Sequence, residues 1–249
     1  MRPRLFQVGF NRCGTASLHR FLRLNGIASV HHAGGRLAIA MDANLRAGRH
    51  VLAGWERFEA FLDMSFLRAH VHVEMYKRWD VLLEQVPEAR FILNLRDVDR
   101  WVASRLAMGP WTEWRRERPA RGFGPPWDAP HPWPVARVPP FRERYRRCHG
   151  LAGLDEVVAH WRADWARHVA AVRASVPADR LLAFDIEREP PEALCRFVGL
   201  DASAARHWGH ENPGPGRLGR ALAGWAPRTL TRRVPDSVRR AARHALRRR

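Results

Sequence analysis

The feature that most restricts the fold of this chain is an apolar segment that runs through a glycine-containing loop into a helical pattern. Residues 5–10, Leu-Phe-Gln-Val-Gly-Phe, are short and apolar enough to predict a buried strand. From Thr15 onward, apolar side chains recur at helical spacing until the stop signal Asn25-Gly26. The N–H groups and positive dipole end of such a helix face the loop, so this order predicts an anion-binding loop. The alternative is an ordinary glycine turn.

Further along the chain, strand-like and helix-like segments alternate. Buried strands are predicted over 91–95 and 181–184, and helices over 74–86, 99–106 and the stretch from Pro190-Pro191 to Gly199. Such alternation is typical of a parallel sheet with helices on both faces. The sequence therefore predicts an α/β fold with a P-loop-like parallel sheet flanked by helices.

Two segments differ in composition from this pattern. Residues 110–140 contain nine of the 18 prolines and four tryptophans, which excludes long helices and central strands there. We therefore predict an α/β domain over 1–213 in which 107–150 is an insert, either a packed surface loop or a lid over the site. The second segment, 214–249, is an arginine-rich tail with a weak apolar stripe, which predicts a basic amphipathic helix or a solvated tail.

The charge is strongly positive and unevenly distributed. Lys+Arg number 43 against 25 Asp+Glu, a net charge of +18. The tail carries 11 arginines and one acid, or +10, which leaves +8 for the first 213 residues. This balance predicts polyanionic partners, namely nucleic acid, an anionic membrane surface or ligands bearing phosphate or sulfate. Lys77 is the sole lysine, so coding composition is an alternative source of the arginine excess.

The sequence also bears on compartment and metal content. No apolar run approaches the ~18 residues that a membrane span needs, and no signal-peptide pattern follows Met1. The three cysteines and 13 histidines lack the spacing of a metal site. We therefore predict a cytoplasmic protein without a metal, with peripheral membrane attachment through the tail as an alternative.

The glycine loop differs from the loop of nucleoside triphosphatases in one position. Gly9 and Gly14 have the separation of the G-x-x-x-x-G-K-[ST] pattern, but Thr15 stands where the lysine belongs. That lysine contacts the β- and γ-phosphates, so its absence argues against an ATPase or a kinase. The loop cation comes earlier, as Arg12.

Residues 11–18, Asn-Arg-Cys-Gly-Thr-Ala-Ser-Leu, resemble the 5′-phosphosulfate loop of sulfotransferases that use 3′-phosphoadenosine 5′-phosphosulfate (PAPS). The second motif of that family is a strand that ends in arginine, with a serine eight residues later. Arg96 and Ser104 match it, and Trp101 matches the R-D-x-x-x-W-x-x-S form of many bacterial members. Val98 replaces the common proline. The resemblance extends over roughly residues 12–200.

The resemblance implies in-line transfer of the sulfuryl group from PAPS to a hydroxyl or amine, without a metal. Arg12 would stabilise charge on the leaving phosphate. The residues that would bind the donor are Arg12, Cys13, Gly14, Thr15, Ala16, Ser17, Arg96 and Ser104. A late basic loop with Arg217 and Arg220 could add contacts to the 3′-phosphate.

The acceptor also needs a general base, for which the family uses histidine or a carboxylate. Asp63, flanked by apolar residues, is our first candidate, His32 after the first helix the second and Glu74 the third. For each of them, a helix cap or a solvated side chain is the alternative role.

The expected acceptor is a small molecule, a lipid or a carbohydrate, and nucleic acid is not the expected partner. Three other functions remain open at this point. The chain could be a P-loop-like nucleotide-binding protein or kinase lacking the Walker lysine. It could be a basic protein that binds nucleic acid or a membrane surface. It could also be a sulfotransferase-like protein that binds its ligand without catalysis.

Overall fold

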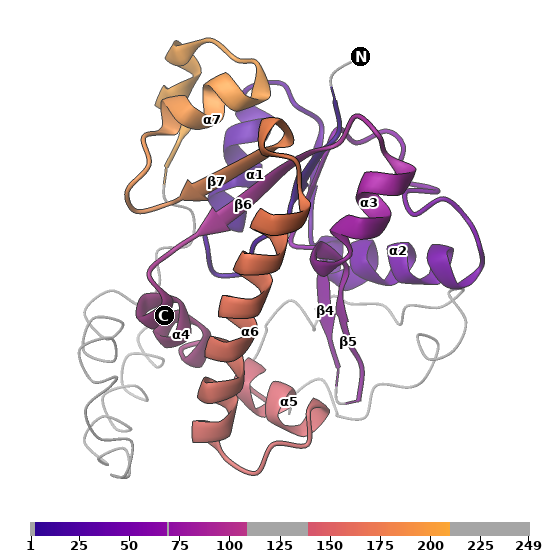
Figure 1. Ribbon diagram of the computed structural model, residues 1–249, viewed down its shortest axis with the longest axis vertical. Coiled ribbons are helices and arrows are strands. Elements are labelled where there is room, and N and C mark those ends of the chain that lie inside the picture. The colour runs from indigo at the N-terminus through magenta and orange to yellow at the C-terminus, as the bar shows by residue number, and fades with distance from the viewer. Residues whose placement is uncertain (1–2, 69, 109–138, 210–249) are drawn as a thin grey trace, which may run out of the picture.

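The computed structural model describes residues 3–68, 70–108 and 139–209, and its centre is a five-stranded parallel sheet (Figure 1). The strand order is β2-β3-β1-β6-β7, and every neighbouring pair is parallel. The strands are β1 Leu5–Gln7, β2 Ser29–His31, β3 Ala60–Leu62, β6 Arg90–Leu95 and β7 Leu181–Asp185. The predicted α/β fold is confirmed.

Helices cover both faces of this sheet. They are α1 Thr15–Leu24, α2 Arg36–Arg46, α3 Trp79–Gln85, α4 Val98–Leu106, α5 Phe141–Cys148, α6 Leu154–Ser175 and α7 Pro191–Val198. Short 3₁₀ turns lie at Ala33–Gly35, Met75–Lys77, Ala178–Arg180 and Ala202–His207. A separate antiparallel hairpin joins β4 Ser65–Leu67 to β5 His72–Glu74.

Successive side chains of a strand point to opposite faces of the sheet, so the core consists of two layers. Phe6 stacks between Phe61 and Phe91, with ring centroids 5.2 and 5.8 Å apart, on the face covered by α2 and α4 to α6. The neighbouring residues Leu5 and Ile92 point to the other face, where α1 and α7 pack. The loops at the carboxyl ends of the strands are therefore held between two packed layers.

Two element boundaries differ from the prediction. The helix expected from Glu74 begins at Trp79, because Glu74 ends β5, where it pairs with Ser65. The strand expected over residues 5–10 ends at Gln7. A Cβ on Gly9 would collide with the carbonyl oxygen and side chain of Asn94, so the chain at Gly9 runs closer to β6 than any other residue type allows.

The predicted insert is only partly described. Its last residues form α5, which packs against α4 and α6 and adds Phe141 and Tyr145 to the core. The remainder, 109–138, and the tail from 210 on, with Arg217 and Arg220, lie outside the described residues, so the lid and the tail helix stay predictions. None of the helices in the described ranges is long and apolar enough to cross a membrane.

Candidate active site at the carboxyl ends of the strands

The loop between β1 and α1 turns sharply at two positions with positive φ. Arg12 has φ of 67° and Gly14 of 74°. At Gly14 a Cβ would also come within 3.2 Å of Ile186, so both conformation and space favour glycine there. Gly14 is the N-cap of α1 and brings no side chain to the N–H groups of the first turn. Such N–H groups, together with the positive end of the helix dipole, attract anions, so the geometry is compatible with the predicted anion-binding loop.

Three of the residues predicted to bind the donor meet around this loop. The Nε–H of Arg12 donates to Ser104 Oγ on α4 over 3.0 Å, and Arg96 at the end of β6 donates from Nη1 to the Arg12 carbonyl over 3.3 Å. Burial lowers the pKa of the Arg12 guanidinium, and the positive charge of Arg96 lowers it further. Two cations at such close range favour a bound anion between them.

Arg96 also has an acidic partner that the sequence did not suggest. The partner is not the adjacent Asp97, because the Arg96 Nε lies 3.0 Å from Glu187 Oε1. Arg100 Nη1 lies 3.2 Å from the same oxygen. Asp97 instead caps α4 by accepting from the N–H groups of Asp99 and Arg100. Arg96 is therefore oriented by a residue from the loop after β7.

Two buried side-chain amides connect the loop to the sheet, and sequence reasoning missed both. Asn94 donates from Nδ2 to the Cys13 carbonyl over 2.6 Å, and Gln7 donates from Nε2 to Asn94 Oδ1 over 2.6 Å. Gln7 Oε1 accepts the N–H of Asp63 over 2.8 Å. Both amides are polar residues within apolar strand segments, and that interruption is the signal by which they could have been found.

Asp63, the first candidate for the base, lies close to the loop. It follows β3 with φ of 49°, and its Oδ1 accepts from Ser65 Oγ over 2.7 Å. Its Oδ2 lies 3.8 Å from Nε2 of His31, which in turn lies 3.0 Å from Thr15 Oγ1. His31 therefore links Asp63 to the first residue of α1.

The other two candidates have different roles. The Nδ1 of His32 accepts the N–H of Gly35 over 3.1 Å and so caps a 3₁₀ turn. A base role for His32 stays a prediction, and the residue that ends β2 beside Thr15 and Asp63 is His31. Burial opposes ionisation of Glu74, but His72, Lys77 and Tyr76 outweigh it and hold its pKa at about 2. Such a carboxylate is a weak base.

The remaining loop residues act mainly through the backbone. Cys13 is fully buried, and burial raises the pKa of its thiol, so the thiol is a poor nucleophile. Its carbonyl is the acceptor for Asn94. Ala16 and Ser17 lie in the first turn of α1, and the Ser17 side chain is buried.

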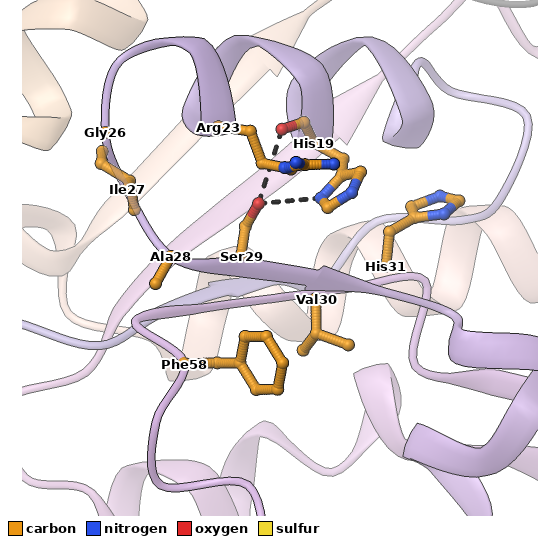
Figure 2. Close-up of a pocket in the computed structure, with 9 residues that line it drawn as sticks. All are labelled: His19, Arg23, Gly26, Ile27, Ala28, Ser29, Val30, His31 and Phe58. Carbon is orange, nitrogen blue, oxygen red and sulfur yellow. Dashed lines mark hydrogen bonds between the residues drawn. The ribbon is translucent and has the colours of Figure 1, made fainter.

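A shallow groove of about 610 Å³ runs along the outer edge of β2, beside α1 (Figure 2). His19 from α1 and Ser29 from β2 line it in contact with each other, with Ser29 Oγ 2.8 Å from His19 Nδ1. His31 stands at one end, its ring stacked on His19 at 5.5 Å. Burial, followed by the charges of His31 and Arg23, lowers the pKa of His19 to about 4. None of the lining residues is acidic.

Comparison with known families agrees with this geometry. A family model described as a sulfotransferase domain matches residues 4–214, which include the loop, both arginines, Ser104 and Asp63. The chain belongs to the sulfotransferase family. No curated protein matches the chain. The resemblance inferred from the two motifs is thus confirmed, and the chain has the domain of an enzyme that transfers sulfuryl groups.

In this sulfotransferase the two motifs form one continuous polar site. Arg12, Arg96 and Ser104 come together, and Asp63 approaches Thr15 through His31. In the described part of the chain, no cluster of three or more His, Cys, Asp or Glu side chains could hold a metal ion. The arginines around Cys13 of the loop are Arg12, Arg96 and Arg105.

Proposed function

We propose that this sulfotransferase uses PAPS as donor and transfers the sulfuryl group to a hydroxyl or amine by in-line displacement. The observation that carries the proposal is the contact between the two motifs. Arg96 and Ser104 both hydrogen-bond to Arg12, one through its carbonyl and the other through its side chain. A ligand with a phosphate at Arg96 and a second anionic group at the loop would fit this arrangement, and PAPS has both groups.

The chemistry requires positioning and charge stabilisation. The acceptor oxygen or nitrogen forms a bond to sulfur while the bond from sulfur to the bridging phosphate oxygen breaks. The electron pair of the broken bond stays on that oxygen and leaves adenosine 3′,5′-bisphosphate. Arg12 and the first-turn N–H groups of α1, from Thr15 to Ser17, would stabilise the charge that develops there.

The proton of the acceptor would go to the pair formed by Asp63 and His31. Asp63 Oδ2 and His31 Nε2 lie 3.8 Å apart, and the same nitrogen lies 3.0 Å from Thr15 Oγ1 at the edge of the loop. An acceptor that approaches the loop from the β2 and β3 side would thus meet a base next to the sulfuryl group. A carboxylate beside an imidazole stabilises the imidazolium that forms on proton transfer.

For the acceptor we propose a small molecule, a lipid or a carbohydrate in the cytoplasm. The groove beside His31 supports an acceptor with an anionic group, because Arg23 lines it and none of its lining residues is acidic. The excess of positive charge supports peripheral contact with an anionic membrane. A nucleoside triphosphatase or a kinase is disfavoured, because the one lysine, Lys77, pairs with Glu74 and Asp164 instead of a phosphate.

Calorimetric titration with adenosine 3′,5′-bisphosphate, beside 5′-AMP and ATP at physiological salt, tests the donor. We expect the bisphosphate to bind at least about tenfold more tightly than 5′-AMP, because hydrogen bonds to charged groups contribute about 1.5–3 kcal/mol each. Equal affinity for the three nucleotides would remove PAPS as the donor. Binding to any polyanion with a steep salt dependence would favour the nucleic-acid alternative.

A further inference from the structure

Arg105 is a buried cation enclosed by aromatic rings. It follows Ser104 on α4, and its side chain is 1% exposed. The guanidinium carbon lies 4.7 to 5.8 Å from the ring centroids of Phe10, Trp101, Phe141, Tyr145 and Trp161. In the described part of the chain, its Nη1 has no hydrogen-bond acceptor. The guanidinium is thus stabilised largely by ring faces.

One hydrogen bond of Arg105 is directed at the anion-binding loop. Its Nε donates to Asn11 Oδ1 over 3.1 Å. The indole N–H of Trp101, on the same helix, donates to the Asn11 carbonyl over 3.0 Å. Asn11 is therefore held through both its side chain and its backbone, one residue before Arg12.

The energetics of this arrangement are unusual for a residue with only a packing role. Removing a guanidinium from water costs free energy, and contacts between the cation and the ring faces offset part of that cost. An apolar side chain of similar length would fill the same space without that desolvation cost. An apolar side chain would not reproduce the hydrogen bond from the Arg105 Nε to Asn11 Oδ1.

We propose that Arg105 is a positioning residue of the donor site, which fixes Asn11 and through it the backbone at Arg12. The inference rests on the proposed function, in which this loop holds the 5′-phosphosulfate of the donor. Arg12 has positive φ, so its carbonyl and side-chain directions depend on how its neighbours are held. Arg105 would act through Asn11, without contact to the ligand.

The test compares two ligands that differ only at the 5′-phosphate. In Arg105→Met, the affinity for adenosine 3′,5′-bisphosphate should fall about tenfold, because a displaced loop loses part of its contact with the 5′-phosphate. The affinity for adenosine 3′-phosphate should stay within twofold of the wild type, because that ligand has no group at the loop. Both titrations are made at a temperature where thermal unfolding shows the variant folded.

Arg144→Met is the matched control. Arg144 is also 1% exposed, lies on α5, and donates from Nη1 to the Leu67 carbonyl of the β4–β5 hairpin over 2.9 Å. This variant also removes a buried guanidinium, so it reports the general effect of that loss. We expect it to leave the affinities for both ligands unchanged, whatever its effect on the melting temperature.

Asn11→Ala removes the acceptor of the same hydrogen bond. Because Asn11 is only half-buried, this variant can test the inference even if Arg105→Met does not fold. It should reproduce the tenfold loss, and the double variant should lose little more than either single one. Arg105→Lys keeps the charge but not the planar Nε donor, and should not restore the affinity.

Three results would overturn the inference. One is wild-type affinity for the bisphosphate in folded Arg105→Met, and another is wild-type affinity in Asn11→Ala. The third is an equal loss for both ligands, which would indicate general disruption of the site. Failure of the wild-type chain to bind the bisphosphate would instead refute the proposed function, and the inference with it.

Discussion

The donor side of the site, formed by residues 9–15, Arg96 and Ser104, is held by arginines and buried amides. The acceptor side, formed by His19, His31 and Asp63, consists of imidazole and carboxylate side chains, the groups that serve as general bases in enzymes. On the donor side, polar groups meet through the backbone of the loop, as in the bonds from Asn94 and Arg96 to loop carbonyls. We infer from this difference that the donor side binds a polyanion with its fixed positive charges. The acceptor side would take up the proton that the acceptor loses.

The two sides are joined at a few contacts. Gln7 bonds both Asn94 on the donor side and the backbone of Asp63 on the acceptor side. His31 contacts Thr15 at the start of α1. Substitutions that affect one side alone therefore separate donor binding from proton transfer.

The largest effect is expected from Arg12→Ala. Turnover of radiolabelled PAPS should fall by about 10³-fold, the cost of removing one group that stabilises developing charge. The fold should persist, because Arg12 lies in the half-buried loop between β1 and α1 and its side chain is not part of the apolar core. Arg78→Ala serves as control, because this exposed arginine pairs with Asp80 at the start of α3. Turnover within tenfold of the wild type would show that the donor side acts through its backbone alone.

Asp63→Asn should lower turnover by about 10²-fold, since general-base catalysis contributes 10²–10⁴-fold. Asparagine tolerates the positive φ at this position and keeps the N–H that Gln7 accepts, so the fold should be preserved. Affinity for the bisphosphate should stay within twofold, as measured by calorimetry. Asp42→Asn, which removes an exposed pair with Arg46, is the control. An unchanged rate would place the base elsewhere.

Arg96→Ala should weaken binding of adenosine 3′,5′-bisphosphate by tenfold or somewhat more, because a charge-assisted hydrogen bond contributes about 1.5–3 kcal/mol. Binding of 5′-AMP, which lacks the 3′-phosphate, should change little. Calorimetry with the two ligands on one protein preparation measures both. A similar loss of affinity for 5′-AMP would mean that Arg96 holds the loop through the Arg12 carbonyl and does not bind the 3′-phosphate.

The smallest effect concerns the β4–β5 hairpin, where burial lowers the pKa of His72 to about 4 despite the opposing charge of Glu74. As the pH falls from about 6.5 toward 4, the unfolded chain takes up this proton first, so the free energy of unfolding decreases. The slope for one proton is at most about 1.4 kcal/mol per pH unit. His72→Gln should reduce this slope in urea unfolding at several pH values between 7.5 and 5.

His50→Gln is the control for that series, because His50 is exposed and lies in the turn after α2. A slope in His72→Gln equal to that of the wild type would assign the acid sensitivity to other groups. His19, whose pKa is also held at about 4, would contribute with the same sign on the acceptor side.

The parts of the site that were predictable from the sequence are local ones. Residues 9–15 lead from a strand into the start of a helix, and Arg96 and Ser104 belong to one strand–helix unit. Within one unit, spacing in the sequence determines placement in space. The contact of His31 with Thr15 was not predictable, because it depends on β2 ending at His31, and a strand end cannot be fixed to one residue from sequence.

The sequence by itself determined the parallel α/β architecture, the loop and the spacing of the two arginine motifs. Only the tertiary structure decided which distant groups hold them: Gln7 with Asn94 across 87 residues, Arg96 with Glu187 across 91, and Arg105 with Asn11 across 94. A strand or an anion-binding loop follows from the backbone conformation of adjacent residues. A contact between side chains so far apart in the chain depends on how the layers pack, and no local pattern specifies that packing.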